Sequence, residues 1–322
     1  TGVLSLQAVN MAAGTELILE GGASGSVTAG NVTVVVPNAS GNITVEPFVN
    51  EASDADASFT VGNVTLTTAL PASDATITFI ASNGDNPADA SGMTLGNFTL
   101  TSSENGDDVH TYEVGALTNV GTGTMSVGTI STMDGNLTNA AGGTLTTGVI
   151  TAMTGDVVNT AAGSITTSVT GLTGDVTNNG GGSMNFTGKV TGAVSNDNVA
   201  SVLTIKGASS ATGLFTNAGA GAGKGLILEA NLTLSGTENH DFVGGSVSGA
   251  GKIILTNAGA ITLEAGSGDL GSVDMNGAGM VTIVDDVVAT TVTADYVTVG
   301  GGGLHSALQM DRQSNLTWIL SM

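Results

Sequence analysis

Residues 135–147 read Gly-Asn-Leu-Thr-Asn-Ala-Ala-Gly-Gly-Thr-Leu-Thr-Thr, and this phrase decides the fold. Its first half, Gly-x-apolar-x-Asn, occurs at six successive places along the chain. The six asparagines are separated by 20, 20, 19, 18 and 21 residues. They are Asn119, Asn139, Asn159, Asn178, Asn196 and Asn217. Self-similarity at so constant a period predicts a repeat architecture.

The second half of the phrase indicates strands. Apolar residues alternate with Thr and Ser, as in Gly143-Thr-Leu-Thr-Thr147 and Gly163-Ser-Ile-Thr-Thr167, and this is the period of a β-strand. A unit of about 20 residues is too short to enclose a core, so successive units must stack. The pattern predicts a β-solenoid in which equivalent residues lie about 4.8 Å apart and asparagine side chains form a ladder.

Two other all-β architectures compete with the solenoid. A propeller uses blades of about 40 residues, which two units could supply, but its recurrent signatures are not seen. A β-sandwich needs about 100 residues per domain and no 20-residue register. The predicted fold is therefore an all-β solenoid with coils of about 20 residues, an irregular N-terminal β domain and almost no helix. The expected domains are residues 1–114 (irregular and acidic), 115–300 (solenoid) and 301–322 (a tail strand after a Gly-rich hinge).

Composition and charge exclude several functions. The 322 residues include 50 Gly and no Cys, and only 3% are aromatic. No disulfide or Cys-ligated metal site is possible. With 27 acidic and 5 basic residues the net charge is −22, which would repel phosphate backbones and makes a nucleic-acid partner improbable. Apolar runs fall short of the roughly 18 residues that span a bilayer, so the chain is not expected to cross a membrane.

The acidic residues suggest a metal rather than a catalytic site. Oxygen ligands of the kind that Ca²⁺ prefers are offered by three acidic pairs. These are Asp54 and Asp56, Asp85 and Asp89, and Asp107 and Asp108. None has EF-hand spacing, so solvated surface charge explains them equally well. The three histidines are not spaced as zinc ligands, and we expect no enzymatic activity and no cofactor other than a possible Ca²⁺.

The C-terminal tail differs from the rest of the chain. It follows four glycines at 300–303 and ends in an alternating run that contains Leu316, Trp318 and Leu320. These residues could form a strand that pairs with the sheet edge of a neighbouring copy. The alternative is that the tail caps its own domain.

A second phrase, Gly-Asn-apolar-Thr-apolar, lies at 30–34, 41–45, 62–66 and 96–100. Each copy reads as a strand entered through a Gly-Asn turn. The phrase also creates Asn-x-Thr sequons, which Thr-rich strands generate by ordinary alternation.

The repeats resemble those of large exported bacterial surface proteins, on the phrase at 135–147 and a related stretch at 249–259. Such families include filamentous-haemagglutinin-like adhesins, autotransporter passengers and some S-layer proteins. The resemblance implies an exported β-helical shaft and transfers no catalytic residue. We expect an extracellular structural protein that assembles with its own copies into a cell-surface filament, sheath or layer, with divalent cations or surface glycans as further partners. The alternative is a carbohydrate-binding or carbohydrate-cleaving β-helix, as in an adhesin tip or a phage spike.

Overall fold

A computed structural model describes the fold, and every described element is a β-strand. The described residues are 8–10, 16–18, 26–36, 41–50, 58–68, 75–83, 91–100, 110–219, 223–238, 240–242, 245–256, 260–263, 272–275, 280–283, 291–293 and 296–299. The predicted fold class is confirmed: a parallel β-solenoid makes about 7 turns over residues 114–254, and irregular strands precede them. The chain divides into two compact units, unit 1 (Thr1–Thr170) and unit 2 (Gly171–Met322).

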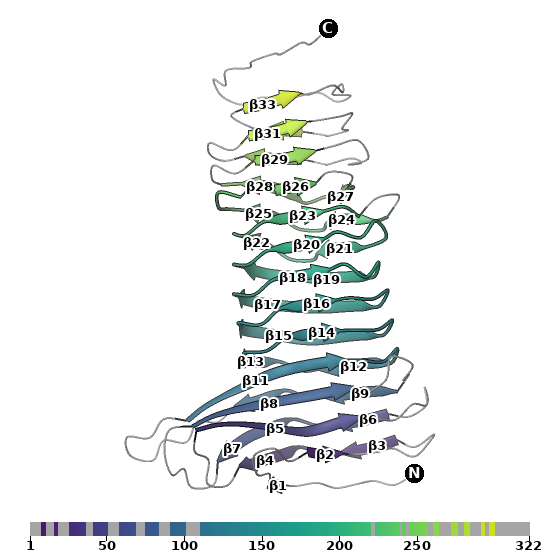
Figure 1. Ribbon diagram of the computed structural model, residues 1–322, viewed down its shortest axis with the longest axis vertical. Helices are drawn as coiled ribbons and strands as arrows, with labels where there is room; N and C mark the ends of the chain where they lie inside the picture. The colour runs from purple at the N-terminus through teal and green to yellow at the C-terminus, as the bar shows by residue number, and fades with distance from the viewer. Residues whose placement is uncertain are drawn as a thin grey trace. The chain divides into compact units, whose positions relative to one another are not determined.

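Unit 1 is built from three columns of parallel strands (Figure 1). Column A contains β3 (Ser26–Ala29), β6 (Ser58–Val61), β9 (Gly92–Leu95), β12 (Thr124–Val127) and the first half of β15 (Thr144–Met153). Column B contains β1 (Ala8–Asn10), β4 (Val32–Val36), β7 (Val64–Thr68), β10 (Phe98–Leu100), β13 (Ile130–Met133) and the second half of β15. Column C contains β2 (Glu16–Ile18), β5 (Gly41–Asn50), β8 (Ala75–Asn83), β11 (His110–Asn119), β14 (Leu137–Asn139) and β16 (Val157–Asn159).

Strand alternation separates a dry interior from a polar exterior in each coil of unit 1. In β15, Leu145 is fully buried while Thr144 and Thr146 point outward. The in-register strands place buried residues above one another, so Met93, Met125 and Leu145 form one continuous apolar column. Each coil therefore completes its core only against its neighbours, as a 20-residue repeat requires.

The N-terminal coils are longer than the later ones, and aromatic residues fill them. β5 and β11 each carry one extra residue relative to β8, between Val45 and Phe48 and between Val114 and Leu117. Ring centroids lie 5.8 Å apart for Phe48 and Phe59, 5.9 Å for Phe48 and Phe79, and 4.7 Å for Phe79 and Phe98. A wider coil encloses more space, and these large side chains occupy it.

Unit 2 repeats the three-column plan. One column contains β18 (Val176–Asn178), β20 (Val194–Asn196), β23 (Phe215–Asn217), β26 (His240–Phe242), β29 (Ala260–Leu263), β31 (Met280–Ile283) and β33 (Tyr296–Val299). Another contains the first half of β19 (Ser183–Val190), β21 (Val202–Ile205), β24 (Gly225–Leu228) and β27 (Val247–Gly249). The last contains the second half of β19, β22 (Ser209–Ala211), β25 (Leu232–Leu234), β28 (Lys252–Leu255), β30 (Ser272–Met275) and β32 (Thr291–Thr293). β17 (Ser164–Leu172) contains the boundary between the units.

Candidate functional site

The repeat asparagines lie inside the solenoid and bond to one another in each unit. In unit 1 the Nδ2 of Asn119 donates to the Oδ1 of Asn139 at 2.8 Å, and Asn139 donates to Asn159 at 3.0 Å. In unit 2 the same bond joins Asn178 to Asn196 and Asn196 to Asn217, each at 2.8 Å. All six side chains are at most 1% exposed. Burial in a low-dielectric interior strengthens such bonds and makes an unpaired amide costly.

A second bond from each of the three asparagines of unit 1 closes a corner of its own coil. Asn139 Nδ2 also donates to the carbonyl oxygen of Gly143 at 3.0 Å, and Asn119 and Asn159 bond in the same way to the glycines four residues after them. A Cβ on Gly143 would lie 2.5 Å from the Nδ2 of Asn119. Glycine recurs four residues after the asparagine because the backbone and the asparagine amide of the preceding coil occupy the space of a side chain.

The ladder of unit 1 has two rungs that the 20-residue period does not reveal. Asn50 donates to the Oδ1 of Asn83 at 2.7 Å, and Asn83 donates to Asn119 at 2.8 Å. Asn50 lies 33 residues before Asn83, and Asn83 lies 36 residues before Asn119. Neither Asn50 nor Asn83 has a glycine four positions before it. The shared signal is an apolar residue two positions before the asparagine, which holds for Phe48 and Ala81.

A second ladder runs along an exposed corner of unit 1 and explains the Gly-Asn phrase. The Oδ1 of Asn31 accepts a bond from the backbone N–H of Asn63 at 2.9 Å, and Asn63 accepts from Asn97 at 3.1 Å. Asn97 in turn accepts from the backbone N–H of Thr129 at 2.9 Å. The copy at 41–45 lies within β5 instead, in register with β8. Three of the four phrases therefore mark one corner of successive coils.

The residues predicted to bind calcium and to mediate assembly lie outside the described part of the chain. These residues are Asp54, Asp56, Asp85, Asp89, Asp107, Asp108, Leu316, Trp318 and Leu320. Among the residues that the structure describes, no three His, Asp or Glu side chains are grouped as metal ligands would be. The calcium site and the tail strand remain predictions.

The ladder of unit 2 ends where the repeat sequence changes. The register of β23 and β26 pairs Thr216 with Asp241, which places Phe242 beside Asn217. The rings of Phe215 and Phe242 stack at 5.3 Å. His240 is 1% exposed, and its Nδ1 accepts a bond from the backbone N–H of Phe215 at 3.2 Å. Burial lowers the pKa of His240 below its ordinary value of 6.5, because the interior disfavours the charged ring.

His240 should make the protein less stable in acid. The unfolded chain takes up a proton as the pH falls through 6.5, whereas the folded chain does so only at its lower pKa. Between these two pKa values unfolding is accompanied by the uptake of a proton. The free energy of unfolding therefore decreases as the pH is lowered, by up to about 1.4 kcal/mol per pH unit. Urea midpoints of the wild type and His240→Gln, measured across this range, should show a steeper decline in the wild type. Parallel profiles would contradict the prediction.

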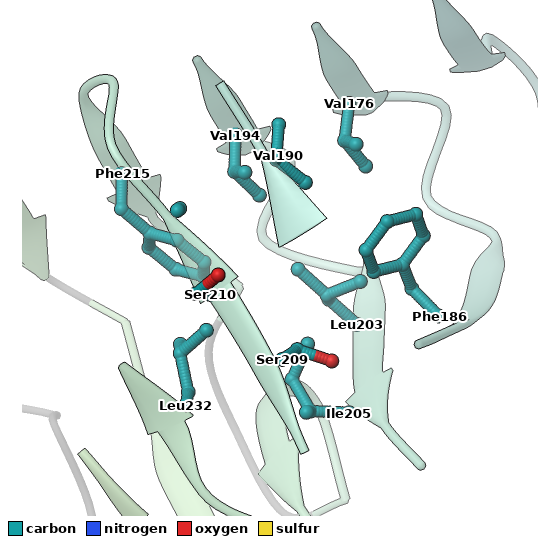
Figure 2. Close-up of a pocket in the computed structure, with 11 residues that line it drawn as sticks. Val176, Phe186, Val190, Val194, Leu203, Ile205, Ser209, Ser210, Phe215 and Leu232 are labelled. Atoms are coloured by element: carbon teal, nitrogen blue, oxygen red, sulfur yellow. The ribbon is translucent and has the colours of Figure 1, made fainter. Parts of the chain in front are cut away.

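One cavity lies inside unit 2 and is a packing gap. Its volume is about 10 Å³, and Figure 2 shows Val176, Val194, Phe215 and Leu232 among the apolar side chains around it. The lining hydroxyl of Ser209 is already bonded to the carbonyl of Gly207 at 2.8 Å. A space of this size is at the lower limit for one water molecule and offers it few polar partners. The cavity is too small for a substrate.

The candidate functional features are thus the ladders and the outer strand faces. Comparisons with protein-family models, with curated proteins and with solved structures each find no match. Within the described ranges, no helix is long and apolar enough to cross a membrane.

Proposed function

We propose that this chain is an extracellular structural protein that assembles with its own copies into a cell-surface filament, sheath or layer. The observation that supports the proposal is the pairing at the ends of the strand columns. Among the described strands, β3 of unit 1 pairs only with β6, and β33 of unit 2 pairs only with β31. An edge that no described strand covers could accept a strand of another copy through the same backbone hydrogen bonds that join the coils.

Net charge determines the conditions under which copies associate. At −22, with only five basic residues, copies repel one another unless salt or divalent cations screen them. Calcium bound by the acidic segments would reduce this repulsion. Assembly is therefore proposed to depend on Ca²⁺.

Electron microscopy of the purified chain in calcium and in chelator tests this function. We expect ordered filaments or sheets in calcium and dispersed particles in chelator. A Trp318→Ser variant reports on the tail, because strand exchange predicts that polymers are lost while the thermal unfolding of the monomer is unchanged. Monodisperse wild-type particles under both conditions would contradict the proposal.

A further inference from the structure

The outward positions of column A in unit 1 form a regular array of hydroxyl groups. Column A and the first half of β17, which pairs with β15, carry eleven described outward positions, and ten of these eleven residues are Thr or Ser. We call this array the hydroxyl face. One row contains Thr28, Thr60, Thr94, Ser126, Thr146 and Thr166, and the other contains Ser58, Gly92, Thr124, Thr144 and Ser164.

The geometry of the hydroxyl face is a two-dimensional lattice. Parallel pairing sets about 4.8 Å between coils, and the two positions of one strand lie about 6.6 Å apart. Thr28, Thr94, Thr124 and Thr166 are exposed. The two rows contain no charged residue although the chain carries a net charge of −22.

The lattice is held in place before any ligand arrives. Buried residues alternate with the hydroxyl positions, and Phe59, Met93 and Met125 are each at most 1% exposed. Neighbouring hydroxyls also bond across coils, as the Oγ of Ser164 does to the Oγ1 of Thr144 at 3.1 Å. A preformed surface loses little conformational entropy when it binds.

The lattice is not simply the result of a Thr-rich composition, because other faces lack it. On column C of unit 1 the row that contains Ser82, Thr118 and Thr138 continues to Val158. In unit 2 the corresponding outward positions include Val202 and Ile227. Column B of unit 1 has a single hydroxyl row, with Thr33, Thr65 and Thr99 in register, whereas its second row pairs Val35 with Thr67. Among the described strands, the array with two rows of hydroxyl residues is therefore that of column A.

We propose that the hydroxyl face binds the surface of ice. A rigid lattice with two fixed repeats, of about 4.8 and 6.6 Å, is complementary to a ligand that repeats in two dimensions on the same scale, as the oxygen atoms of an ice surface do. Thr hydroxyls supply hydrogen bonds to lattice water, while their methyl groups order the water between the rows. An uncharged face matches this neutral ligand. One copy supplies the whole face, so the inference does not depend on self-assembly.

Partition into ice tests the proposal on the full chain, in chelator, where the proposed function predicts separate copies. During slow growth of an ice hemisphere the wild type should be incorporated, and it should inhibit recrystallisation of fine-grained ice. Thr146→Lys, which introduces a charge into one of the two rows, should raise the concentration needed for inhibition by about tenfold or more. Thr138→Lys adds the same charge to column C of the same unit and should leave ice binding unchanged.

Three results would overturn the inference. These are exclusion of the wild type from ice, equal losses in Thr146→Lys and Thr138→Lys, and no loss in Thr146→Lys. Thermal unfolding of both variants establishes that each is folded, and Thr146→Val separates the roles of hydroxyl and methyl. Pull-down on crystalline cellulose or chitin, with binding lost in Thr146→Lys and no ice activity, would assign the face to a polysaccharide instead.

Discussion

Asn139→Ala is expected to lower the free energy of unfolding by about 2–5 kcal/mol. Asn139 accepts a bond from Asn119 and donates to Asn159 and to the carbonyl of Gly143. Truncation leaves all three partners buried with one bond fewer, at a site that is 0% exposed to solvent. The midpoint of guanidinium unfolding measures the loss.

Asn136→Ala is the matched control because the residue type and the coil are the same. Asn136 is exposed, and its Oδ1 accepts one bond from the backbone N–H of Asp156 at 2.8 Å. Water can replace that bond, so the expected loss is about 0.5–1 kcal/mol. Equal midpoints for the two variants would show that the buried ladder adds no more stability than the exposed corner.

Gly155→Ala is expected to destabilise the protein by about 3 kcal/mol or more, or to prevent folding. A Cβ at Gly155 would overlap the backbone carbonyl of Gly135 in the preceding coil. Backbone atoms cannot rotate aside as a side chain does, so the two coils must separate. The separation would lengthen the flanking bonds from Thr154 N to the Met133 oxygen and from Leu137 N to the Asp156 oxygen, now 3.0 and 2.8 Å. Thermal unfolding and expression yield report the effect.

Gly142→Ala is the control for Gly155→Ala. Its Cβ would have as nearest neighbour the Cγ2 of Thr122 at 4.0 Å, so we expect a change within about 0.5 kcal/mol. A Gly155→Ala protein as stable as Gly142→Ala would show that neighbouring coils can move apart at this corner without loss.

The sequence predicts the solenoid because its period is carried by residues with a physical reason to recur. Asn139 needs an amide in the next coil, and Gly135 and Gly143 lie where a side chain would meet the preceding coil. These constraints keep the spacing near 20 residues between 115 and 217. The alternation of Thr with apolar residues predicts β-strands. In each coil of unit 1 the apolar residues of these strands are buried on the inner side.

The features that the sequence does not predict depend on coils of unequal length. Asn50 and Asn83 stand 33 and 36 residues from their next partners, so a search at a fixed period passes over them. Thr28, Thr60 and Thr94 fall into one row only when the register of β3, β6 and β9 is known. The environment of His240 likewise depends on which strand lies beside β23.

The asparagine ladders make successive coils interchangeable. Each rung joins two identical side chains, and the rungs on either side of Asn139 are made by the same residue in the same geometry. An in-frame duplication of one coil would therefore find its partners already in place above and below it. A globular domain has no such freedom, because an inserted segment meets a core already filled by other residues. Lineages that inherit this architecture can change the length of the protein one coil at a time, by gene copying alone.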